Sequence, residues 1–329
     1  MTSSSRQKNF FDLFPAPEFL LLSTVGISIT DEDIKFVQLR RQIFEDGFKL
    51  VHSSKIINPE EAIKSGLIND PSKIVSILKE LSLHYGIRYA RASLPEEKAY
   101  LFTTTIGWVP HEGLKDAVAF IIEENVPVTL AESVFDFEVI REDKNADEIK
   151  LTVSVLPKNV VQSYIELFES AGIVPVSFDT ESQAIARALV HRGDKRSHLI
   201  VNLSIENTGF YIVEEEVVQF STTPAYGFGK DDLYPNLNDL KAEMRKVLAF
   251  WNAHTDPSSE RKIEKVFLCG PGAGKEDFVR KLMDGSDVRY VIGDVWLNTS
   301  PSRSHIPKIT FDESLDYASA IGLVLPRRK

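Results

Sequence analysis

The sequence predicts an α/β protein made of two similar halves, with a small α/β unit inserted in the first half. Strand-like and helix-like runs alternate along the chain, which is typical of this fold class. Two hairpin patterns, at 25–39 and 200–213, share one layout: an apolar strand, a short polar turn and a second apolar strand. Between them, residues 87–156 form a compact mixed block. Two like hairpins, each opening an α/β half, predict a duplicated fold with a cleft between the halves, where ligands commonly bind.

The first hairpin pattern, Val25–Arg41, has alternating apolar residues on both sides of a polar turn at 30–33. A helix is predicted next, because Asp70 can cap a helix N-terminus and Pro71 suits the first helical position. Gly86 ends this helix, and its apolar face consists of Ile74, Ile77, Leu78 and Leu81.

The mixed block contains four strand-like runs and one amphipathic helix. The runs are Ile87–Leu94, Tyr100–Ile106, Val134–Arg141 and Ile149–Leu156. The helix lies between the second and third runs, and its apolar face consists of Leu114, Val118, Ile121 and Ile122. We therefore expect a small inserted α/β subdomain here.

The rest of the chain again alternates between helix and strand patterns. A helix that stops at Gly172 has an apolar face of Val160, Val161, Tyr164, Leu167 and Phe168. A strand at Val174–Phe178 then leads into a helix over Glu181–Leu189. After the second hairpin we expect a long helix near Leu237–Trp251, a strand at Lys265–Leu268 and a helix of small residues at Tyr317–Leu323.

Composition narrows the classes of function. The 329 residues carry 38 Lys and Arg against 48 Asp and Glu, a net charge of −10, so a nucleic-acid partner is not expected. The single cysteine, Cys269, excludes an intramolecular disulfide, and the seven histidines are widely spaced, so no metal site is predicted. No segment approaches the ~20 apolar residues of a membrane span. We therefore expect a cytosolic protein without a membrane span.

The glycine-rich turn at 270–275 (GPGAGK) does not match either common phosphate-binding pattern. A P-loop would need glycine at Cys269 and a hydroxyl residue at Glu276, and a dinucleotide fingerprint would need glycine at Lys275. Two interpretations remain open for this turn. The glycines allow a tight chain reversal, or they let the backbone approach a flat ligand such as adenine.

Six segments, in their order and spacing, resemble the PilM family of type IV pilus assembly proteins, actin-like proteins related to the cell-division protein FtsA. They are FPAPEFL at 14–20, VGISITDEDIKFVQL at 25–39, YIELFESAGIVPVSFDTESQAIARAL at 164–189, LIVNLSIENTGFYIV at 199–213, VFLCGPGAG at 266–274 and YASAIGLVL at 317–325. The resemblance covers the chain from about residue 9 onward.

The resemblance implies an actin-like duplicated fold, with two lobes around a nucleotide cleft. It divides the chain into an N-terminal arm at 1–20, a first lobe at 21–86, an inserted subdomain at 87–178 and a second lobe at 199–309. Segments near 179–198 and 310–329 are expected to complete the first lobe.

The resemblance also implies a cleft with altered loops. Where the family has Asp and then a small residue in its first phosphate loop, this chain has Ser28 and Thr30. In the second loop, Asn202 and Ser204 stand where the family has Asp and Gly. The loss of both aspartates removes about two negative charges from the magnesium site, and hydroxyl or amide groups alone replace them poorly.

Part of the family's nucleotide site survives in the sequence. Glu181 matches a water-orienting, catalytic glutamate of related ATPases, Lys35 matches a lysine after the first loop, and Gly270 and Gly272 match part of the adenosine-binding turn. A carboxylate at the start of a helix also stabilises the helix dipole, so this structural role for Glu181 stays open.

Two main hypotheses on function follow from the resemblance. In the first, the chain is a cytoplasmic scaffold at the inner membrane that binds the N-terminal cytoplasmic peptide of a PilN-like membrane protein, and no cofactor is needed. In the second, it is an actin-like ATPase in which ATP and magnesium regulate partner binding or self-association. A sugar-kinase relative is a third, weaker alternative. The family implies a peptide groove between the first lobe and the inserted subdomain and a link to the pilus assembly ATPases; the groove residues are not predicted.

Overall fold

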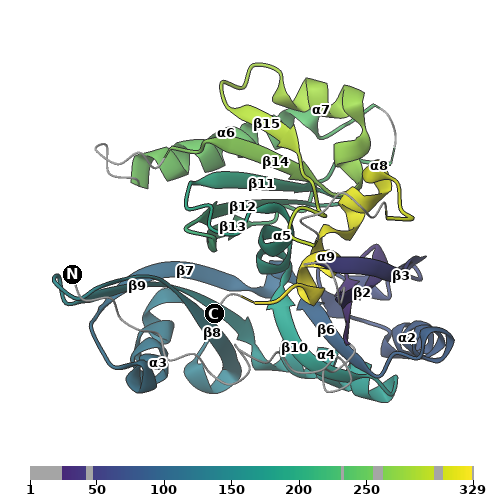
Figure 1. The fold of residues 1–329 in the computed structure, drawn as a ribbon, viewed down its shortest axis with the longest axis horizontal. Helices are drawn as coiled ribbons and strands as arrows, with labels where there is room; N and C mark the ends of the chain where they lie inside the picture. The colour runs from purple at the N-terminus through teal and green to yellow at the C-terminus, as the bar shows by residue number, and fades with distance from the viewer. Residues whose placement is uncertain (1–23, 42–46, 231–232, 255–261, 300–306, 328–329) are drawn as a thin grey trace.

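The computed structural model describes residues 24–41, 47–230, 233–254, 262–299 and 307–327. They form two lobes and a smaller unit beside the first lobe (Figure 1). The N-terminal arm expected at 1–20 lies outside the described residues. None of the helices in these ranges is long and apolar enough to cross a membrane.

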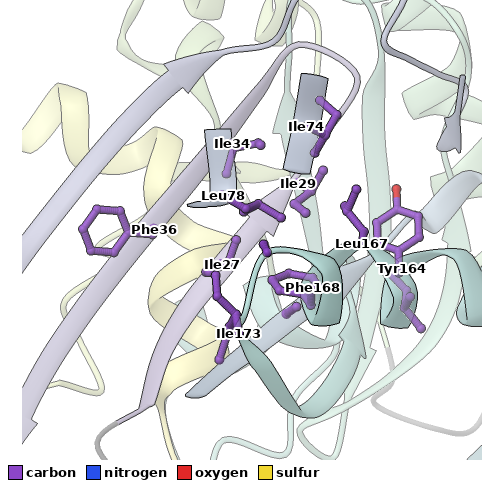
Figure 2. Close-up of a cluster of buried hydrophobic side chains, with 14 of the residues drawn as sticks. Ile27, Ile29, Ile34, Phe36, Ile74, Leu78, Tyr164, Leu167, Phe168 and Ile173 are labelled. Atoms are coloured by element: carbon purple, nitrogen blue, oxygen red, sulfur yellow. The ribbon is translucent and has the colours of Figure 1, made fainter. Parts of the chain in front are cut away.

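The first lobe is built on a five-stranded sheet with the order β10-β6-β1-β2-β3. One face of the sheet packs against α2 (Pro71–Tyr85) and α4 (Lys158–Ser170). Figure 2 shows this core, in which strand residues such as Ile27 meet Leu78 of α2 and Phe168 of α4. The strands are β1 (Thr24–Ile29), β2 (Asp33–Arg41), β3 (Phe48–Ile57), β6 (Tyr89–Leu94) and β10 (Val174–Thr180), and a two-stranded ribbon consists of β4 (Ile63–Lys64) and β5 (Leu67–Ile68).

The second lobe has a five-stranded sheet with the order β13-β12-β11-β14-β15. Its core lies under α6 (Leu237–His254) and α7 (Glu276–Met283), through residues such as Leu240 and Phe278. The strands are β11 (His198–Leu203), β12 (Thr208–Glu214), β13 (Val217–Thr222), β14 (Lys265–Cys269) and β15 (Arg289–Ile292).

The duplication predicted from the two hairpins is confirmed strand by strand. In the first lobe, β1 pairs antiparallel with β2 on one side and parallel with β6 on the other. In the second lobe, β11 pairs in the same way with β12 and β14. Ile27 pairs with Phe36 in the first hairpin, and Val201 pairs with Phe210 in the second. These are equivalent positions, so the two hairpins share one register.

The inserted unit is a three-stranded sheet, β7-β9-β8, covered by α3 (Leu114–Asn125). The expected range, 87–178, is too wide, because β6 and β10 at its two ends pair within the sheet of the first lobe. Ala90 and Ala92 of β6 are fully buried there. A short apolar run looks the same in either sheet, so the sequence alone did not separate them. The strands of the unit are β7 (Tyr100–Gly107), β8 (Ser133–Asp143) and β9 (Glu148–Pro157).

The two lobes meet along α5 (Glu181–Leu189) and α9 (Ala318–Val324), which pack between both sheets. A Cβ at Gly322 would overlap the carbonyl oxygen of Ala184, so the small residues predicted for the last helix allow this close approach. Helix α5 thereby places Glu181 at its start between the lobes. The remaining helical segments are α8 (Phe311–Ser314) and the 3₁₀ turns at Glu96–Lys98, His111–Gly113, Leu130–Glu132, Pro271–Gly274 and Leu315–Tyr317.

Candidate functional site

Two loops face each other where the lobes meet. The first cleft loop, residues 30–32, joins β1 to β2, and the second cleft loop, residues 204–207, joins β11 to β12. Between them lie an interlobe cavity of about 500 Å³, which Glu32 and Glu206 help to line, and a second space of only about 20 Å³. Of the predicted site residues, Thr30, Ser204 and Glu181 line this space, together with Glu96 and Glu97.

Ser28 and Asn202, which the resemblance matches to aspartates of the family, lie deeper and do not line that space. Ser28 is buried in β1 opposite Lys35. Asn202 is buried in β11, and its Oδ1 accepts a hydrogen bond of 3.6 Å from the Cys269 thiol. Both side chains are therefore enclosed by the protein around them.

Lys35 belongs to a compact ion cluster at one side of the cleft. Its Nζ lies 2.6 Å from Asp33 Oδ1 and 2.8 Å from Asp316 Oδ1. The Nζ of Lys55 lies 2.6 Å from Asp316 Oδ2 and 3.2 Å from Asp33 Oδ2. Burial lowers the pKa of Lys35, but the two carboxylates raise it by more, so its pKa lies above the usual value. The charge of this lysine is thus matched within the protein.

The first cleft loop and the residue after it carry three consecutive carboxylates, and the protein itself provides a partner for each. Asp31 accepts backbone N–H groups from Ser65 and Gly66, the latter at 2.9 Å. Glu32 accepts the backbone N–H of Glu206 in the second lobe at 2.9 Å. Asp33 binds the two lysines of the ion cluster.

Glu181 lies among further carboxyl groups at the floor of the cleft. Its Oε2 accepts a hydrogen bond of 3.1 Å from the Tyr211 hydroxyl. Burial, followed by the charges of Glu97 and Glu96, raises the pKa of Glu181 to about 8. The side chain therefore holds a proton at neutral pH, and a protonated carboxyl group cannot accept a proton from water.

Glu96 and Glu97 also make defined hydrogen bonds. Glu96 is buried and accepts the backbone N–H of Ser182 at 2.9 Å. Glu97 accepts a hydrogen bond of 3.0 Å from the amide of Asn207, which belongs to the second cleft loop. This contact, like that of Glu32, joins the two lobes.

Two glycines of the 270–275 turn are required by close packing. At Gly270, φ is +81°, and a Cβ would lie 2.6 Å from Asn202 Oδ1. At Gly272 a Cβ would lie 2.7 Å from the ring of Phe228. These two predicted residues hold the turn against the second hairpin.

A larger cavity, of about 610 Å³, opens on the other side of this turn. Pro271, Gly274 and Lys275 line it from the turn, and Asp316 and Tyr317 line it from the C-terminal segment. The two ends of the cleft therefore differ: the end at the loops is rich in carboxylates, with little space beside Thr30 and Ser204, and the end at the turn is open.

Sequence reasoning missed most of the acidic residues of the cleft. The run at 31–33 was available as a signal, since three carboxylates in the turn of a proposed phosphate loop oppose a bound phosphate. Asp316 and Lys55 left no signal, because they meet Lys35 only in the folded chain. Within the described ranges, no three His, Cys, Asp or Glu side chains are grouped to hold a metal ion.

Comparisons with known proteins place the chain in a family. No curated protein matches its sequence. Among solved structures, one from a "PilM-PilN type IV pilus biogenesis complex" has a TM-score of 0.77 at 18% identity, over 93% of this chain and 98% of that one. The ethanolamine utilization protein EutJ from Carboxydothermus hydrogenoformans gives a TM-score of 0.48 at 13% identity, over 84% and 86% of the two chains. The cytoplasmic domain of EpsL, an inner membrane component of the type II secretion system of Vibrio cholerae, gives a TM-score of 0.47 at 8% identity, over 90% of this chain and 94% of that one.

The fold and the sequence agree on the family. The predicted actin-like arrangement of two lobes is confirmed by the paired sheets and by the match to the first of these structures. The sequence profile of the family described as type IV pilus assembly protein PilM matches residues 26–231, well over half of the chain. The chain therefore belongs to the PilM family of type IV pilus assembly proteins.

Proposed function

We propose that this protein is a cytoplasmic scaffold of the type IV pilus assembly platform at the inner membrane. In this role it binds the N-terminal cytoplasmic peptide of a PilN-like membrane protein and does not turn over ATP. Family membership supports the pilus role. The similar structure named above comes from a complex with PilN, which supports the partner. Contacts with the pilus assembly ATPases and self-association belong to the same proposal.

The acidic residues at the two cleft loops support the part of the proposal that concerns ATP. A bound triphosphate needs free backbone N–H groups and an available cation. Here Glu32 already accepts the N–H of Glu206, and two aspartates match Lys35 and Lys55. Like charges at short range are costly, so carboxylates around the loops oppose the phosphates.

The magnesium of an actin-like ATPase also fits poorly. Magnesium prefers carboxylate oxygens and keeps most of its water shell. The positions of the two family aspartates hold Ser28 and Asn202, and both are buried. Glu181, the candidate for orienting water, carries a proton at neutral pH. We therefore derive no hydrolytic step at this cleft.

Two sheet edges near the junction of the first lobe and the inserted unit suit an extended peptide. β10 is the outer strand of the first sheet, and β8 is an outer strand of the inserted sheet. Val134 of β8 and Val174 and Val176 of β10 are 42%, 53% and 43% exposed. An extended peptide can add a strand to such an edge and place apolar side chains against it.

Arg327 places the two edges close to each other. Its guanidinium lies 2.5 Å from Asp179 of β10 and 4.0 Å from Asp136 of β8 (Figure 1 shows the two strands near the C-terminus). This agrees with the groove that the family resemblance implies. Association with the membrane then comes through the partner protein.

Peptide binding tests the scaffold proposal. A fluorescent peptide from the cytoplasmic N-terminus of a PilN-like protein is titrated with purified protein, with and without millimolar ATP and magnesium. We expect saturable binding that ATP does not change. Val176→Asp should weaken it at least tenfold, because it adds a charge to an apolar edge. Leu83→Asp, on the exposed face of α2, is the matched control. Absence of binding to the unaltered protein would contradict the proposal.

The ATPase hypothesis keeps one observation in its favour. The cavity of about 610 Å³ beside the glycine turn is open and large enough for a nucleoside. Thermal unfolding with ATP and magnesium, with ADP as a second ligand, tests it together with phosphate release. A stabilisation by ATP and a turnover abolished by Glu181→Ala would favour the enzyme over the scaffold.

A further inference from the structure

We propose that carboxylates of the protein itself join the two lobes across the cleft loops without any ligand, at the place that the proposed function leaves unused. The contact consists of Glu32 with the backbone N–H of Glu206, at 2.9 Å, and Glu97 with the amide of Asn207, at 3.0 Å. We call this pair of hydrogen bonds the interlobe contact. The inference rests on the proposed function, in which no nucleotide bridges the loops.

The interlobe contact uses the donors that a bound anion would use. Backbone N–H groups in a loop are good partners for a phosphate oxygen because they carry partial positive charge and are not otherwise bonded. A carboxylate offers the same kind of oxygen, and hydrogen bonds to charged groups are the stronger ones. Glu32, in the first lobe, thus already accepts the hydrogen bond that the N–H of Glu206 could otherwise donate to an anionic ligand.

Asp31 repeats this arrangement within the first lobe. It accepts the N–H groups of Ser65 and Gly66, whose φ angles are +47° and +73°. Successive N–H groups in such a conformation form a concave site that favours an anion. Two sets of backbone donors around the cleft are therefore filled by neighbouring residues of one loop.

Asp33, the residue after this loop, is linked to a third part of the chain. Through Lys35 and Lys55 it is joined to Asp316, which comes from the C-terminal segment between the lobes. Residues 31–33 thus contact the β4–β5 turn and the second lobe, and they are linked to the C-terminal segment through the two lysines. A nucleotide would have to displace Glu32 before its phosphates reached Glu206.

Hydrogen exchange of the full chain tests this inference. The measured quantity is the exchange rate of the backbone amides in the segment 204–207. Glu32→Ala with Glu97→Ala removes both acceptors and should speed exchange there roughly tenfold or more, because the lost bonds involve charged groups. Glu32→Gln with Glu97→Gln keeps an oxygen at each position and should give a smaller increase.

The matched control is Glu60→Ala. Glu60 is exposed and lines the same interlobe cavity as Glu32. This variant should leave exchange in 204–207 unchanged, and exchange in the strands of both sheets should match the unaltered protein in every variant. The inference is wrong if the double alanine variant exchanges like the control in 204–207.

Two further measurements separate this inference from the proposed function. Tripolyphosphate should raise the melting temperature of the double alanine variant and leave that of the unaltered protein unchanged; equal effects on both would overturn the inference. Binding of the PilN-like peptide, measured on the same proteins, reports on the scaffold role. If the unaltered protein does not bind the peptide, but exchange in 204–207 is faster in the double alanine variant as expected, only the proposed function is contradicted.

Discussion

The hairpin β1–β2 of the first lobe and the hairpin β11–β12 of the second share a backbone and differ in chemistry. Their loops close with the same hydrogen bond, from Thr30 N–H to Asp33 O at 3.0 Å and from Ser204 N–H to Asn207 O at 3.1 Å. The first loop is followed by Lys35 in its ion cluster, and the equivalent position of the second hairpin is Gly209. The duplicated framework therefore persists although the side chains at the cleft have diverged.

This difference gives the two hairpins complementary roles. The first provides an acidic acceptor, Glu32, and the second provides a backbone donor to it and an amide donor to Glu97, which lies outside both hairpins. The donors of the second loop are in this way satisfied by the protein alone. The substitutions below test the two hairpins, together with Glu181, which contacts Tyr211 of the second hairpin.

Lys35→Met should have the largest effect on stability. It leaves Asp33 and Asp316 with Lys55 as their only partner in the ion cluster, and an uncompensated buried charge costs about 3–5 kcal/mol. Denaturant unfolding measures the loss. Lys49→Met, an exposed lysine on β3, is the control and should change stability by less than about 0.5 kcal/mol. Equal effects would mean that the ion cluster does not stabilise the first hairpin.

Gly209→Ala tests the equivalent position of the second hairpin. A Cβ there would overlap the hydroxyl of Tyr211, which is fully buried and bound to Glu181. The ring must move within a packed core, so we expect a loss of about 1–3 kcal/mol. Gly107→Ala, where a Cβ meets open space, is the control. A variant as stable as the control would show that the Tyr211 ring has another position available.

Glu181→Gln should change how stability depends on pH. The pKa of about 8 lies above the usual 4.5, so between these values the folded protein holds a proton that the unfolded chain has released. Stability of the unaltered protein should therefore fall as the pH rises from 5 to 8. The glutamine variant lacks this fall and should gain on it by up to about 1.4 kcal/mol for each pH unit in this range.

Urea unfolding at pH 5, 6.5 and 8 measures this difference, with Glu60→Gln as an exposed control. Parallel curves for the three proteins would contradict the protonated state of Glu181. The same result would restore this residue as a candidate base for the ATPase hypothesis.

Local patterns predicted the framework well, and long-range contacts limited the prediction of the site. The helix face of Tyr164 and Phe168 was predicted from spacing and is buried. The hairpin alignment was predicted because each hairpin is a local unit. The ion cluster was not, since Lys35, Lys55 and Asp316 are far apart in the sequence. The proton on Glu181 depends on neighbouring carboxylates from other elements, which no local pattern reveals.

Thr30→Ala and Ser204→Ala give the smallest and sharpest comparison. The Thr30 hydroxyl accepts the N–H of Asp33 at 3.1 Å and lies 3.2 Å from its carboxylate, so it fixes the loop that carries the acidic residues. The structure records no hydrogen bond of the Ser204 hydroxyl within the described ranges. Thr30→Ala should cost about 1 kcal/mol in urea unfolding and Ser204→Ala almost nothing. If Ser204→Ala is the more costly change, the second loop depends on its side chain after all, and the asymmetry between the hairpins lies in residues 31–33 alone.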